Sequence, residues 1–377
     1  MTTEAEHTAA EEQPRQVGVA TAKVAVLYTR PDAVVQDIGR LMELADFTAH
    51  LSKDASTALK VNISWHKYYP ACSTTPWQLD GVIQALQTAG YRDLVACHNG
   101  TVVVDSHIGE RQNKHLTVQE KHGVRSVHLT DRGQKWVRFA PKGELRVLDH
   151  IFPDGIEIPE ELLGKNVVHM PTLKTHVFTT MTGAMKNAFG GLLHFRRHWT
   201  HSRIHETLVD LLTIQKEIHP GLFAVMDGTI AGDGPGPRAM RPQVKNVILA
   251  SGDMVAIDAV AAKMMGFDPL QIDFIRLAHE RGLGVGDPAK IEVVGVDVSD
   301  VNYGFRGDED TFASWGQKLI YWGPLHRFEG LLLRTPIVPW AYFASRVYYD
   351  LFWWNVVGRG HVRRTKQNEW GQLFDQY

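Results

Sequence analysis

The sequence predicts an α/β fold in which a mixed, largely parallel sheet is flanked by helices, with an aromatic-rich helical C-terminal extension. From Lys23 onward, short β-branched runs alternate with amphipathic segments, which is typical of parallel βαβ units. Of the 377 residues, 44% are hydrophobic, which is enough to bury a substantial core. Six of the ten tryptophans lie in the last 69 residues. We therefore expect a disordered lead-in at 1–22, an α/β core at 23–305 and the extension at 306–377.

The elements of the core are predicted from the period of their apolar residues. Strands are expected where short runs are apolar and β-branched, as in KVAVLYT from Lys23, because such runs are typical of buried parallel strands. Helices are expected where apolar residues recur every three or four positions. In chain order, we expect strands at 23–29, 57–63, 93–99, 165–171, 222–228, 244–251 and 291–298, and helices at 35–51, 77–90, 253–266 and 271–282.

Polar residues mark the starts of two of these helices. Hydroxyl-bearing residues precede Pro76, and Ser251 with Asp253 precedes the next helix start. Short oxygen-bearing side chains satisfy the free backbone N–H groups at such positions. Residues 105–150 are polar and weakly periodic, so an excursion or a small subdomain is expected there. The glycine-rich stretch 227–237 has neither the lysine of a P-loop nor the order of a dinucleotide fingerprint.

The composition argues against several functional classes. A net charge of −2 gives no overall attraction for nucleic acid. Two cysteines, Cys72 and Cys97, are too few for an iron–sulfur cluster or a cysteine-built zinc site. The first twenty residues lack a basic segment followed by an apolar run, so no signal peptide is expected. We predict a cytoplasmic protein, with membrane association as the alternative.

A basic block extends from Thr172 to Glu206. It contains five histidines, two lysines and three arginines against the single carboxylate of Glu206. The block directly follows the predicted strand 165–171, and ligands of open α/β sheets bind beyond the carboxyl ends of strands. Because basic side chains without acidic partners attract anions, the block predicts a site for a small molecule that bears a carboxylate or a phosphate.

The first half of the block suggests an anion-binding turn. Two basic side chains alternate along extended chain and can point into one crevice, and a turn then leads into a helix whose N-terminus would favour an anion. Histidine is suited to proton transfer near neutral pH, and lysine stabilises developing negative charge. The expected catalytic residues are Lys174, His176, Lys186, Asp227 and Asp233. The expected substrate- or cofactor-binding residues are Lys60, Asn62, Thr182, Gly183, Asn187 and Arg197.

The second half of the block contains four histidines at spacings of 4, 3 and 4. On an α-helix, this spacing places all four imidazoles on one face. They either bind a divalent metal (nickel, iron or zinc), bind an anion, lie on a solvated helix flank or hydrogen-bond to a neighbouring element. Nearby arginines oppose a cation site unless they point away. The candidate metal ligands are His194, His198, His201 and His205.

Three segments resemble the family known as domain of unknown function 362 (DUF362). They are LKVNIS with STTP after it, PTLKTHVFTTMTGAMKNAFG, and DGTIAGDGPGP followed by SGDMVAIDAVAAKMMG. The resemblance covers roughly residues 57–295 and implies an α/β fold without implying an activity. Many family members carry a ferredoxin-like cysteine module, which this chain lacks.

The segment from Lys174 to Asn187 is also similar, more remotely, to the active-site region of nickel-pincer lactate racemases. That similarity implies that His176 transfers a proton, that Lys186 contacts the cofactor and that His201 or His198 binds the metal. The glycine and serine pattern that flanks these residues in the racemases is missing here.

We therefore predict an enzyme of isomerase, epimerase or oxidoreductase type that moves a proton or a hydride on an anionic small molecule. Its cofactor would be a divalent metal or a phosphate-bearing organic molecule. The alternatives are a metal-dependent enzyme built on the histidine face and a non-catalytic ligand-binding protein. Residues 309–377 are expected to pack on the core or on a dimer partner, with a peripheral membrane contact as the alternative, because charges and prolines interrupt their apolar runs.

Overall fold

The structure, a computed structural model, describes residues 22–100, 104–193, 195–324 and 347–377. All but Ala22 of the predicted lead-in therefore lies outside the described residues. The centre of the molecule is a ten-stranded sheet. Eight of its strands form a main path, and the other two, β8 (Thr172–His176) and β9 (Thr180–Met181), are attached beside it. The order along that path is β12 (Ile291–Gly295), β1 (Ala22–Tyr28), β11 (Arg241–Ser251), β10 (Leu222–Asp233), β7 (Asn166–Met170), β2 (Thr57–Val61), β3 (Leu94–His98) and β4 (Arg125–His128).

The sheet is mixed and largely parallel. Along its main path, β11 runs antiparallel to both of its neighbours, whereas every other adjacent pair is parallel. Strand β8 pairs parallel with β10, and β9 pairs antiparallel with β8. A separate two-stranded sheet joins β5 (Trp136–Phe139) to β6 (Ile156–Pro159). The predicted fold class is confirmed.

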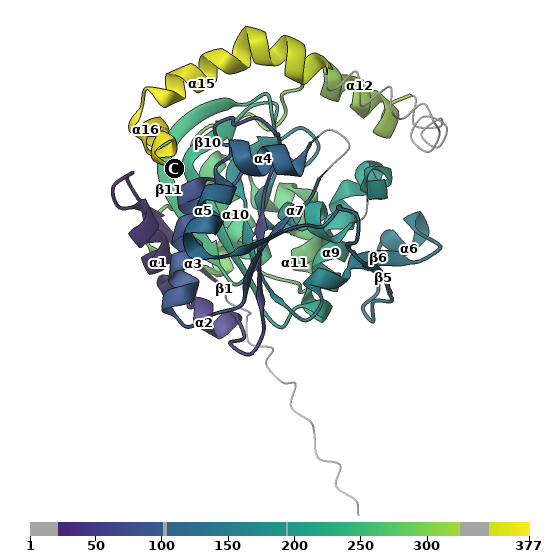
Figure 1. Cartoon of the computed structure of the whole chain (residues 1–377). Helices are drawn as coiled ribbons and strands as arrows, with labels where there is room; N and C mark the ends of the chain where they lie inside the picture. The colour runs from purple at the N-terminus through teal and green to yellow at the C-terminus, as the bar shows by residue number, and fades with distance from the viewer. Residues whose placement is uncertain (1–21, 101–103, 194, 325–346) are drawn as a thin grey trace, which may run out of the picture.

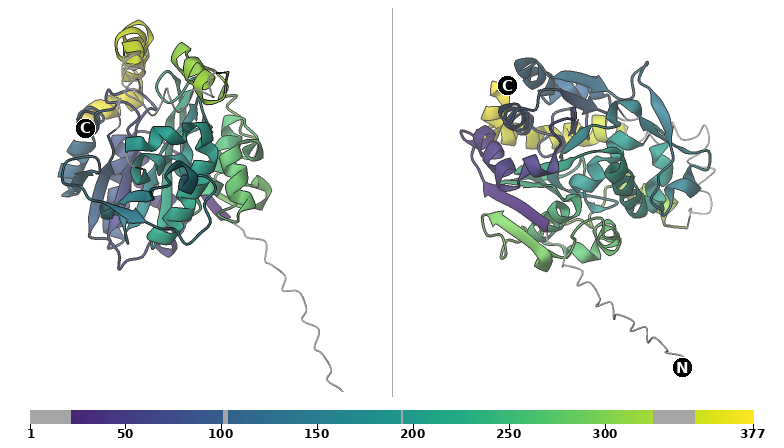
Figure 2. Two further views of the ribbon diagram at one scale, coloured as in Figure 1. Left: turned by 90° about the vertical axis from the view of Figure 1, so that its right-hand side faces the viewer. Right: turned by 90° about the horizontal axis from the view of Figure 1, so that it is seen from below.

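Helices cover both faces of the sheet (Figures 1 and 2). Alternate residues of β1 point to opposite faces, so Val24 and Val26 join one hydrophobic cluster while Ala25 and Leu27 join the other. On the Ala25 face lie α1 (Val34–Leu44), α2 (Phe47–His50), α3 (Pro76–Thr88) and α5 (His115–His122). On the Val24 face lie α7 (Gly183–Asn187), α8 (Phe189–Leu192), α9 (Ile204–Ile218), α10 (Met254–Met265) and α11 (Asp273–Glu280).

The remaining short helices lie in connections and in the extension. In the core they are α4 (Ser106–Gln112), α6 (Leu148–Ile151) and the 3₁₀-helices η1 (Glu160–Leu162), η2 (Phe195–Arg203), η3 (Pro269–Gln271) and η4 (Pro288–Lys290). In the extension they are α12 (Phe312–Tyr321), the π-helix η6 (Val347–Gly358), α15 (Arg359–Lys366) and α16 (Glu369–Gln376). The predicted excursion 105–150 contains α4, α5 and β4, and β4 forms one edge of the main sheet.

Both predicted helix starts are confirmed. The Thr75 side chain accepts a hydrogen bond from the Gln78 backbone N–H in a capping box at α3. At α10, Asp253 accepts hydrogen bonds from the backbone N–H groups of Val255 and Ala256. In contrast, the single helix expected at 35–51 is wrong, because Asp46 adopts a left-handed backbone conformation (φ 51°) that separates α1 from α2.

Strand β10 continues through most of the glycine-rich stretch 227–237. Its glycines permit close contacts there. A Cβ on Gly228 would lie 3.1 Å from the Leu173 Cδ2 of β8, and one on Gly232 would lie 3.2 Å from the Lys174 Cβ. Glycine in a strand interior often marks such an approach of another chain segment. The glycines therefore bring β8, which carries Lys174 and His176, against the end of β10.

The order of the strands creates a switch point between β2 and β7. The chain passes from β2 through β3 to β4 at one edge, and it then returns to place β7 on the other side of β2. At such a point, the connections that leave neighbouring parallel strands diverge and leave a crevice beyond their carboxyl ends. Residues that follow β2, β3 and β8 are thereby brought to one place.

The C-terminal extension packs against the connection between β2 and α3. The Trp65 Nε1–H donates a hydrogen bond of 2.6 Å to Asp350, and the Trp65 ring contacts the rings of Trp353 and Trp354. Farther along, Tyr68 stacks on Phe374 with 3.7 Å between ring centroids. Figure 1 shows this segment in yellow, running across one end of the core. Among the described residues, no helix combines the length and the apolar character needed to cross a bilayer.

Candidate functional site

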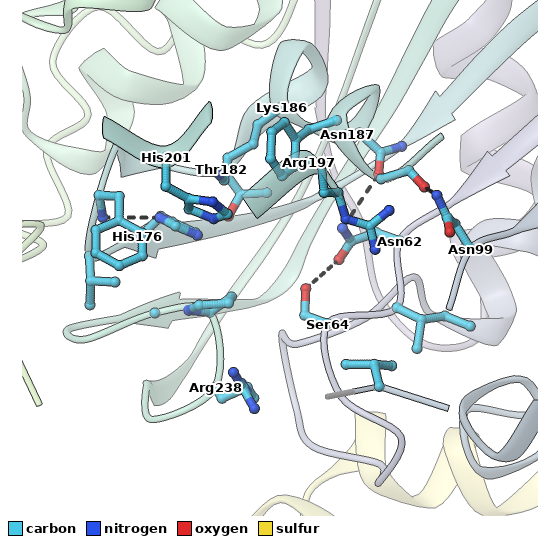
Figure 3. Close-up of a pocket in the computed structure, with 18 of the residues that line it drawn as sticks. Asn62, Ser64, Asn99, His176, Thr182, Lys186, Asn187, Arg197, His201 and Arg238 are labelled. Carbon is cyan, nitrogen blue, oxygen red and sulfur yellow. Dashed lines mark hydrogen bonds between the residues drawn. The ribbon is translucent and has the colours of Figure 1, made fainter. Parts of the chain in front are cut away.

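A cavity of about 510 Å³ lies beyond the carboxyl ends of β2 and β3 (Figure 3). Asn62 follows β2, Asn99 follows β3, and His176 ends β8. Helices α7 and η2 provide a further wall, and the extension contributes Tyr321 and Tyr349. The cavity therefore occupies the position that the switch point predicts.

The described residues that line this cavity include no aspartate and no glutamate. Seven of the described wall residues have basic side chains. They are Lys60, His176, Lys186, Arg197, His198, His201 and Arg238. Such a wall has a positive potential and attracts an anion.

A hydrogen-bond network fixes the floor of the cavity. The Asn187 Nδ2 donates to the Lys60 carbonyl at 2.8 Å, and the Asn62 Nδ2 lies 3.4 Å from the Asn187 Oδ1. The Asn62 Oδ1 in turn accepts from Lys174 Nζ at 2.7 Å and from the Ser64 hydroxyl at 3.0 Å. Lys174 thus lies behind the cavity and orients Asn62 rather than lining the wall itself.

Three lysines at this site are poorly solvated. Burial lowers the pKa of Lys60 to about 8 and that of Lys174 to about 8. For Lys186, burial and then the neighbouring charge of Lys174 lower the pKa to about 7. The Lys186 Nζ lies over the Phe189 ring, 5.3 Å from its centre. Lys186 can therefore gain or lose a proton near neutral pH.

Backbone partners fix the tautomers of two histidines in the wall. The Phe178 backbone N–H donates to His176 Nδ1 at 3.1 Å, so in the neutral ring Nε2 carries the proton. In His201, Nδ1 lies 3.1 Å from the His198 carbonyl, which can only accept, so Nε2 is left with a lone pair. Burial first, and then Lys186, keeps the pKa of His176 well below its usual value and lowers that of His201 to about 3. At neutral pH, His176 is therefore a donor and His201 an acceptor.

Two further polar atoms at the cavity have no hydrogen-bond partner in the part of the chain that the structure describes. Thr182 is 4% exposed and its hydroxyl forms no hydrogen bond, and Asn99 is 7% exposed and its Oδ1 forms none. Both residues line the cavity. Because buried polar groups are almost always paired, these atoms are suited to hydrogen-bond a ligand.

The predicted anion site at the N-terminus of α7 is wrong. The backbone N–H groups of Ala184 and Met185 donate to the two carboxyl oxygens of Asp258, at 2.6 and 3.0 Å. Burial raises the pKa of Asp258 to about 8. A Cβ on Gly183 would lie 2.4 Å from this carboxyl group, so Gly183 makes room for Asp258 rather than binding a ligand.

The prediction that the four histidines share one α-helical face is wrong. Residues 195–203 form a 3₁₀-helix, which has three residues per turn, and α9 begins at Ile204. His198 and His201 line the cavity. His205 instead accepts a hydrogen bond from the Phe274 backbone N–H at 3.2 Å, and His194 lies outside the described residues.

Asp227 and Asp233 lie outside the cavity wall. Asp227 accepts hydrogen bonds from Thr75 Oγ1 at 2.5 Å and from Trp77 Nε1 at 2.8 Å. Asp233 pairs with Arg241 at 3.0 Å. Both carboxylates thus link structural elements and are not placed to contact a ligand in the cavity.

Several cavity residues were missed by the sequence analysis. Asn99 follows β3 as Asn62 follows β2, and because ligands of open α/β sheets bind beyond the carboxyl ends of strands, its position could have been predicted from the sequence. Arg238 follows the glycine- and proline-rich turn, and its guanidinium lies 4.3 Å from the centre of the Tyr349 ring. Tyr321 and Tyr349 come from the extension, and no local pattern connects them with the core.

Comparison with known proteins agrees with the resemblance noted above. The model of the family described as Domain of unknown function (DUF362) matches residues 57–263. A curated relative, a thylakoid-associated protein of Synechocystis sp., is 32% identical over 124 residues, which cover 31% of the chain and 37% of the relative. The match thus spans little more than a third of the relative's length. No solved structure matches the chain.

Proposed function

The chain belongs to the DUF362 family, and we propose that it is an enzyme that transfers protons on a small anionic substrate bound in the cavity. The observation that carries this proposal is the set of basic side chains on a wall whose described residues include no carboxylate. A phosphate or carboxylate group would lie among Lys60, Arg197 and Arg238. Charge-assisted hydrogen bonds of this kind are about twice as strong as neutral ones.

The proposed chemistry rests on three side chains with different protonation states. Lys186, with its pKa near 7, exchanges a proton with the substrate. The His176 Nε2–H donates to an oxygen on which negative charge develops, and His201 Nε2 accepts from a substrate hydroxyl. Proton removal next to a carbonyl needs a base and an oxyanion donor of this kind. The reaction type that we propose is an isomerisation or epimerisation.

The metal-dependent alternative at the histidine face has less support. Among the described residues, the histidines of the cavity do not belong to any group of three ligand atoms close enough to share one ion. Lys186 and Arg197, which line the same wall, add to the cost of placing a cation there. The similarity to lactate racemases stays a prediction, although His176 and Lys186 do line one cavity.

Calorimetry followed by isotope exchange tests the proposal. Inorganic phosphate and small hydroxycarboxylates are titrated into the wild type, Lys186→Met, Arg238→Gln and, as a matched control, Lys53→Met, whose side chain is exposed outside the cavity. We expect an anion to bind the wild type and the control but not the two cavity variants. The anions that bind are then incubated with the protein in deuterated water, and ¹H NMR follows exchange at carbon. Binding without exchange would favour a ligand-binding protein, and equal binding by all variants would refute the proposed site.

We also propose that the extension attaches the protein to the surface of an anionic membrane. Exposed apolar side chains on η6, among them Leu351, Phe352 and Val356, directly precede exposed Arg363 and Arg364 on α15. Apolar residues next to basic ones are typical of interfacial helices. The name of the Synechocystis relative, which states thylakoid association, agrees with this placement.

Vesicle co-sedimentation tests the membrane contact. The protein is mixed with vesicles of phosphatidylcholine alone or with added phosphatidylglycerol. We expect sedimentation with the anionic vesicles, weakened by salt and reduced in Phe352→Asp. The control is Leu163→Asp, at an exposed leucine of the core. Equal sedimentation of both variants would contradict the proposed surface.

A further inference from the structure

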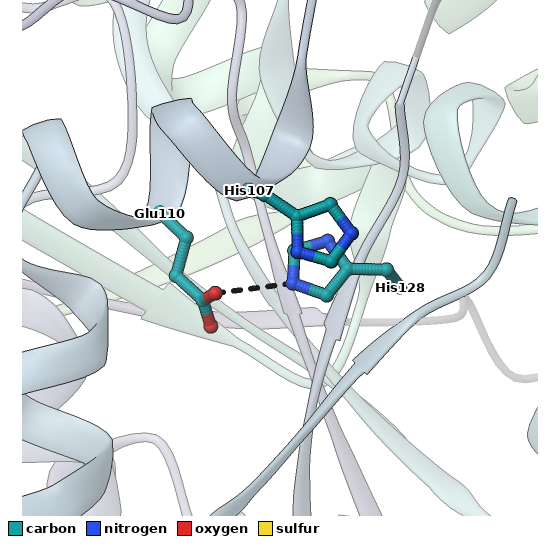
Figure 4. Close-up of side chains that lie close together, drawn as sticks. All are labelled: His107, Glu110 and His128. Atoms are coloured by element: carbon teal, nitrogen blue, oxygen red, sulfur yellow. Dashed lines mark hydrogen bonds and ion pairs between the residues drawn. The ribbon is translucent and has the colours of Figure 1, made fainter. Parts of the chain in front are cut away.

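A second group of side chains that can bind a metal ion lies at the edge of the sheet, outside the anion-binding cavity. His107 and Glu110 come from α4, and His128 ends β4. One ligand atom from each residue lies within 4.8 Å of the other two. Figure 4 shows the three side chains together, with the rings of His107 and His128 stacked at 3.6 Å between centroids. None of the three lines the anion-binding cavity.

The spacing and the distances suit a metal ion. His107 and Glu110 are three residues apart on a helix and share a face. The His128 Nε2 lies 3.0 Å from the Glu110 Oε2. Zinc binds nitrogen and oxygen at about 2.0–2.2 Å, which places tetrahedral ligand atoms about 3.3 Å apart. One ion would replace the direct contact between His128 and Glu110, and the half-exposed His107 ring, which now stacks on His128, would turn so that its nitrogen points to that ion.

Each of the three residues uses one polar atom to contact an outer partner, which leaves its other polar atom to bind an ion. The His107 Nε2 lies 3.0 Å from both carboxylate oxygens of Asp131, so Nδ1 is left to bind an ion. The Ser106 hydroxyl lies 2.8 Å from the His128 Nδ1, so Nε2 is left. A metal-binding imidazole is usually oriented by a hydrogen bond from its other nitrogen to a polar group. Asp131 and Ser106 are placed to provide such bonds for His107 and His128.

The third residue is held in the same way. The Glu110 Oε1 accepts a hydrogen bond of 2.6 Å from the Ser126 hydroxyl and lies 3.1 Å from the His98 Nε2, so Oε2 remains for an ion. Glu110 is 5% exposed. Among the described residues, its ion-pair partners are histidines and not lysine or arginine. A buried carboxylate needs a compensating cation, and imidazoles provide one only when they are protonated.

We propose that His107, Glu110 and His128 bind a first-row divalent transition-metal ion such as Zn²⁺. Two imidazoles and one carboxylate are ligands that zinc accepts, whereas magnesium and calcium prefer oxygen alone. The side chain of His107 is 48% exposed, so an ion can enter from solvent and keep a water molecule as its fourth ligand. The site does not depend on the function proposed for the anion-binding cavity.

Zinc titration of the full chain tests this site. The protein is first treated with a chelator, and Zn²⁺ alone is then added while calorimetry and thermal unfolding are followed. We expect one strongly bound equivalent and a higher melting temperature in the wild type, and loss of both in His107→Ala. Because His107 is half exposed, this variant should fold, which circular dichroism checks. Glu110→Gln, with nearly the same shape, should lose the site as well.

Two further variants make the result specific. Asp131→Asn should bind Zn²⁺ about 10- to 100-fold more weakly, since removal of an outer partner has effects of that size. His150→Ala, at an exposed histidine elsewhere, should bind as the wild type does. Equal zinc affinity in the wild type and His107→Ala, or no strong binding to the wild type, would overturn the proposal.

Discussion

Replacement of Lys186 by methionine is expected to make the protein more stable while removing its affinity for anions. The ammonium group of Lys186 is buried beside the charge of Lys174, and its pKa is lowered from 10.5 to about 7. At about 1.4 kcal/mol per pKa unit, this difference means that keeping Lys186 charged in the folded state costs about 5 kcal/mol. Because Lys186 borders the open cavity, solvent screens part of this cost. We expect Lys186→Met to raise the free energy of unfolding by about 2–3 kcal/mol at low pH.

The sign of the pH dependence follows from the direction of the shift. The folded state holds the Lys186 proton less tightly than the unfolded state does, so the cost is fully present below about pH 7 and vanishes as pH rises toward 10.5. The stability gain of the variant over the wild type should therefore be largest near pH 6 and shrink toward about pH 10. Phosphate at about 100 times its Kd should stabilise the wild type by about 2.7 kcal/mol and leave the variant unchanged.

Urea unfolding at several pH values measures these differences. Lys53→Met serves as the matched control, because Lys53 is exposed, and its stability should stay within about 0.5 kcal/mol of the wild type at every pH. A Lys186→Met protein that is less stable than the wild type near pH 6, or a difference that does not change with pH, would show that Lys186 is not desolvated.

Three other substitutions test the site and the fold. Arg238→Gln should weaken phosphate binding by at least about 10-fold, as measured by calorimetry, because it removes a charge-assisted hydrogen bond worth about 1.5–3 kcal/mol; unchanged affinity would place the anion elsewhere. Thr75→Val should lower the free energy of unfolding by about 1–3 kcal/mol, since it removes both the cap of α3 and a hydrogen bond to Asp227. Gly232→Ala should cost about 1–3 kcal/mol in urea unfolding, whereas Gly316→Ala, where an added Cβ meets nothing within 4 Å, should cost nothing.

The parts of the fold that could be predicted from sequence are those fixed by local chemistry. Buried strands are marked by β-branched runs, and the start of α10 is marked by the capping side chain of Asp253. Lys60 and Asn62 were also predicted, because alternate residues of a strand point to one side and these two could face the same crevice as the basic block. These features depend on neighbouring residues or on strand direction alone.

The features that escaped prediction depend on contacts between distant segments. The N-terminus of α7 looked open to an anion because Asp258, 74 residues away from Ala184 along the chain, could not be placed against it. The prediction of one histidine face assumed an α-helix throughout. His198 and His201 instead lie on a 3₁₀-helix, whereas His205 lies on α9. The group around Glu110 was missed because residues 105–150 carry little periodicity, so β4 could not be assigned to the sheet edge.

If the cavity binds an anion as proposed, the division of its wall between core and extension would separate two kinds of selectivity. Each basic side chain that the structure describes in the wall lies within residues 57–263, the part that matches the family. The extension contributes neutral side chains, Ser314, Gln317, Tyr321 and Tyr349. Exchange of this segment between proteins with the same core would leave the preference for negative charge intact and alter the size and shape of the molecule admitted. The shared core would thus set which charge is accepted, and each protein's own C-terminal segment would set which compound is accepted.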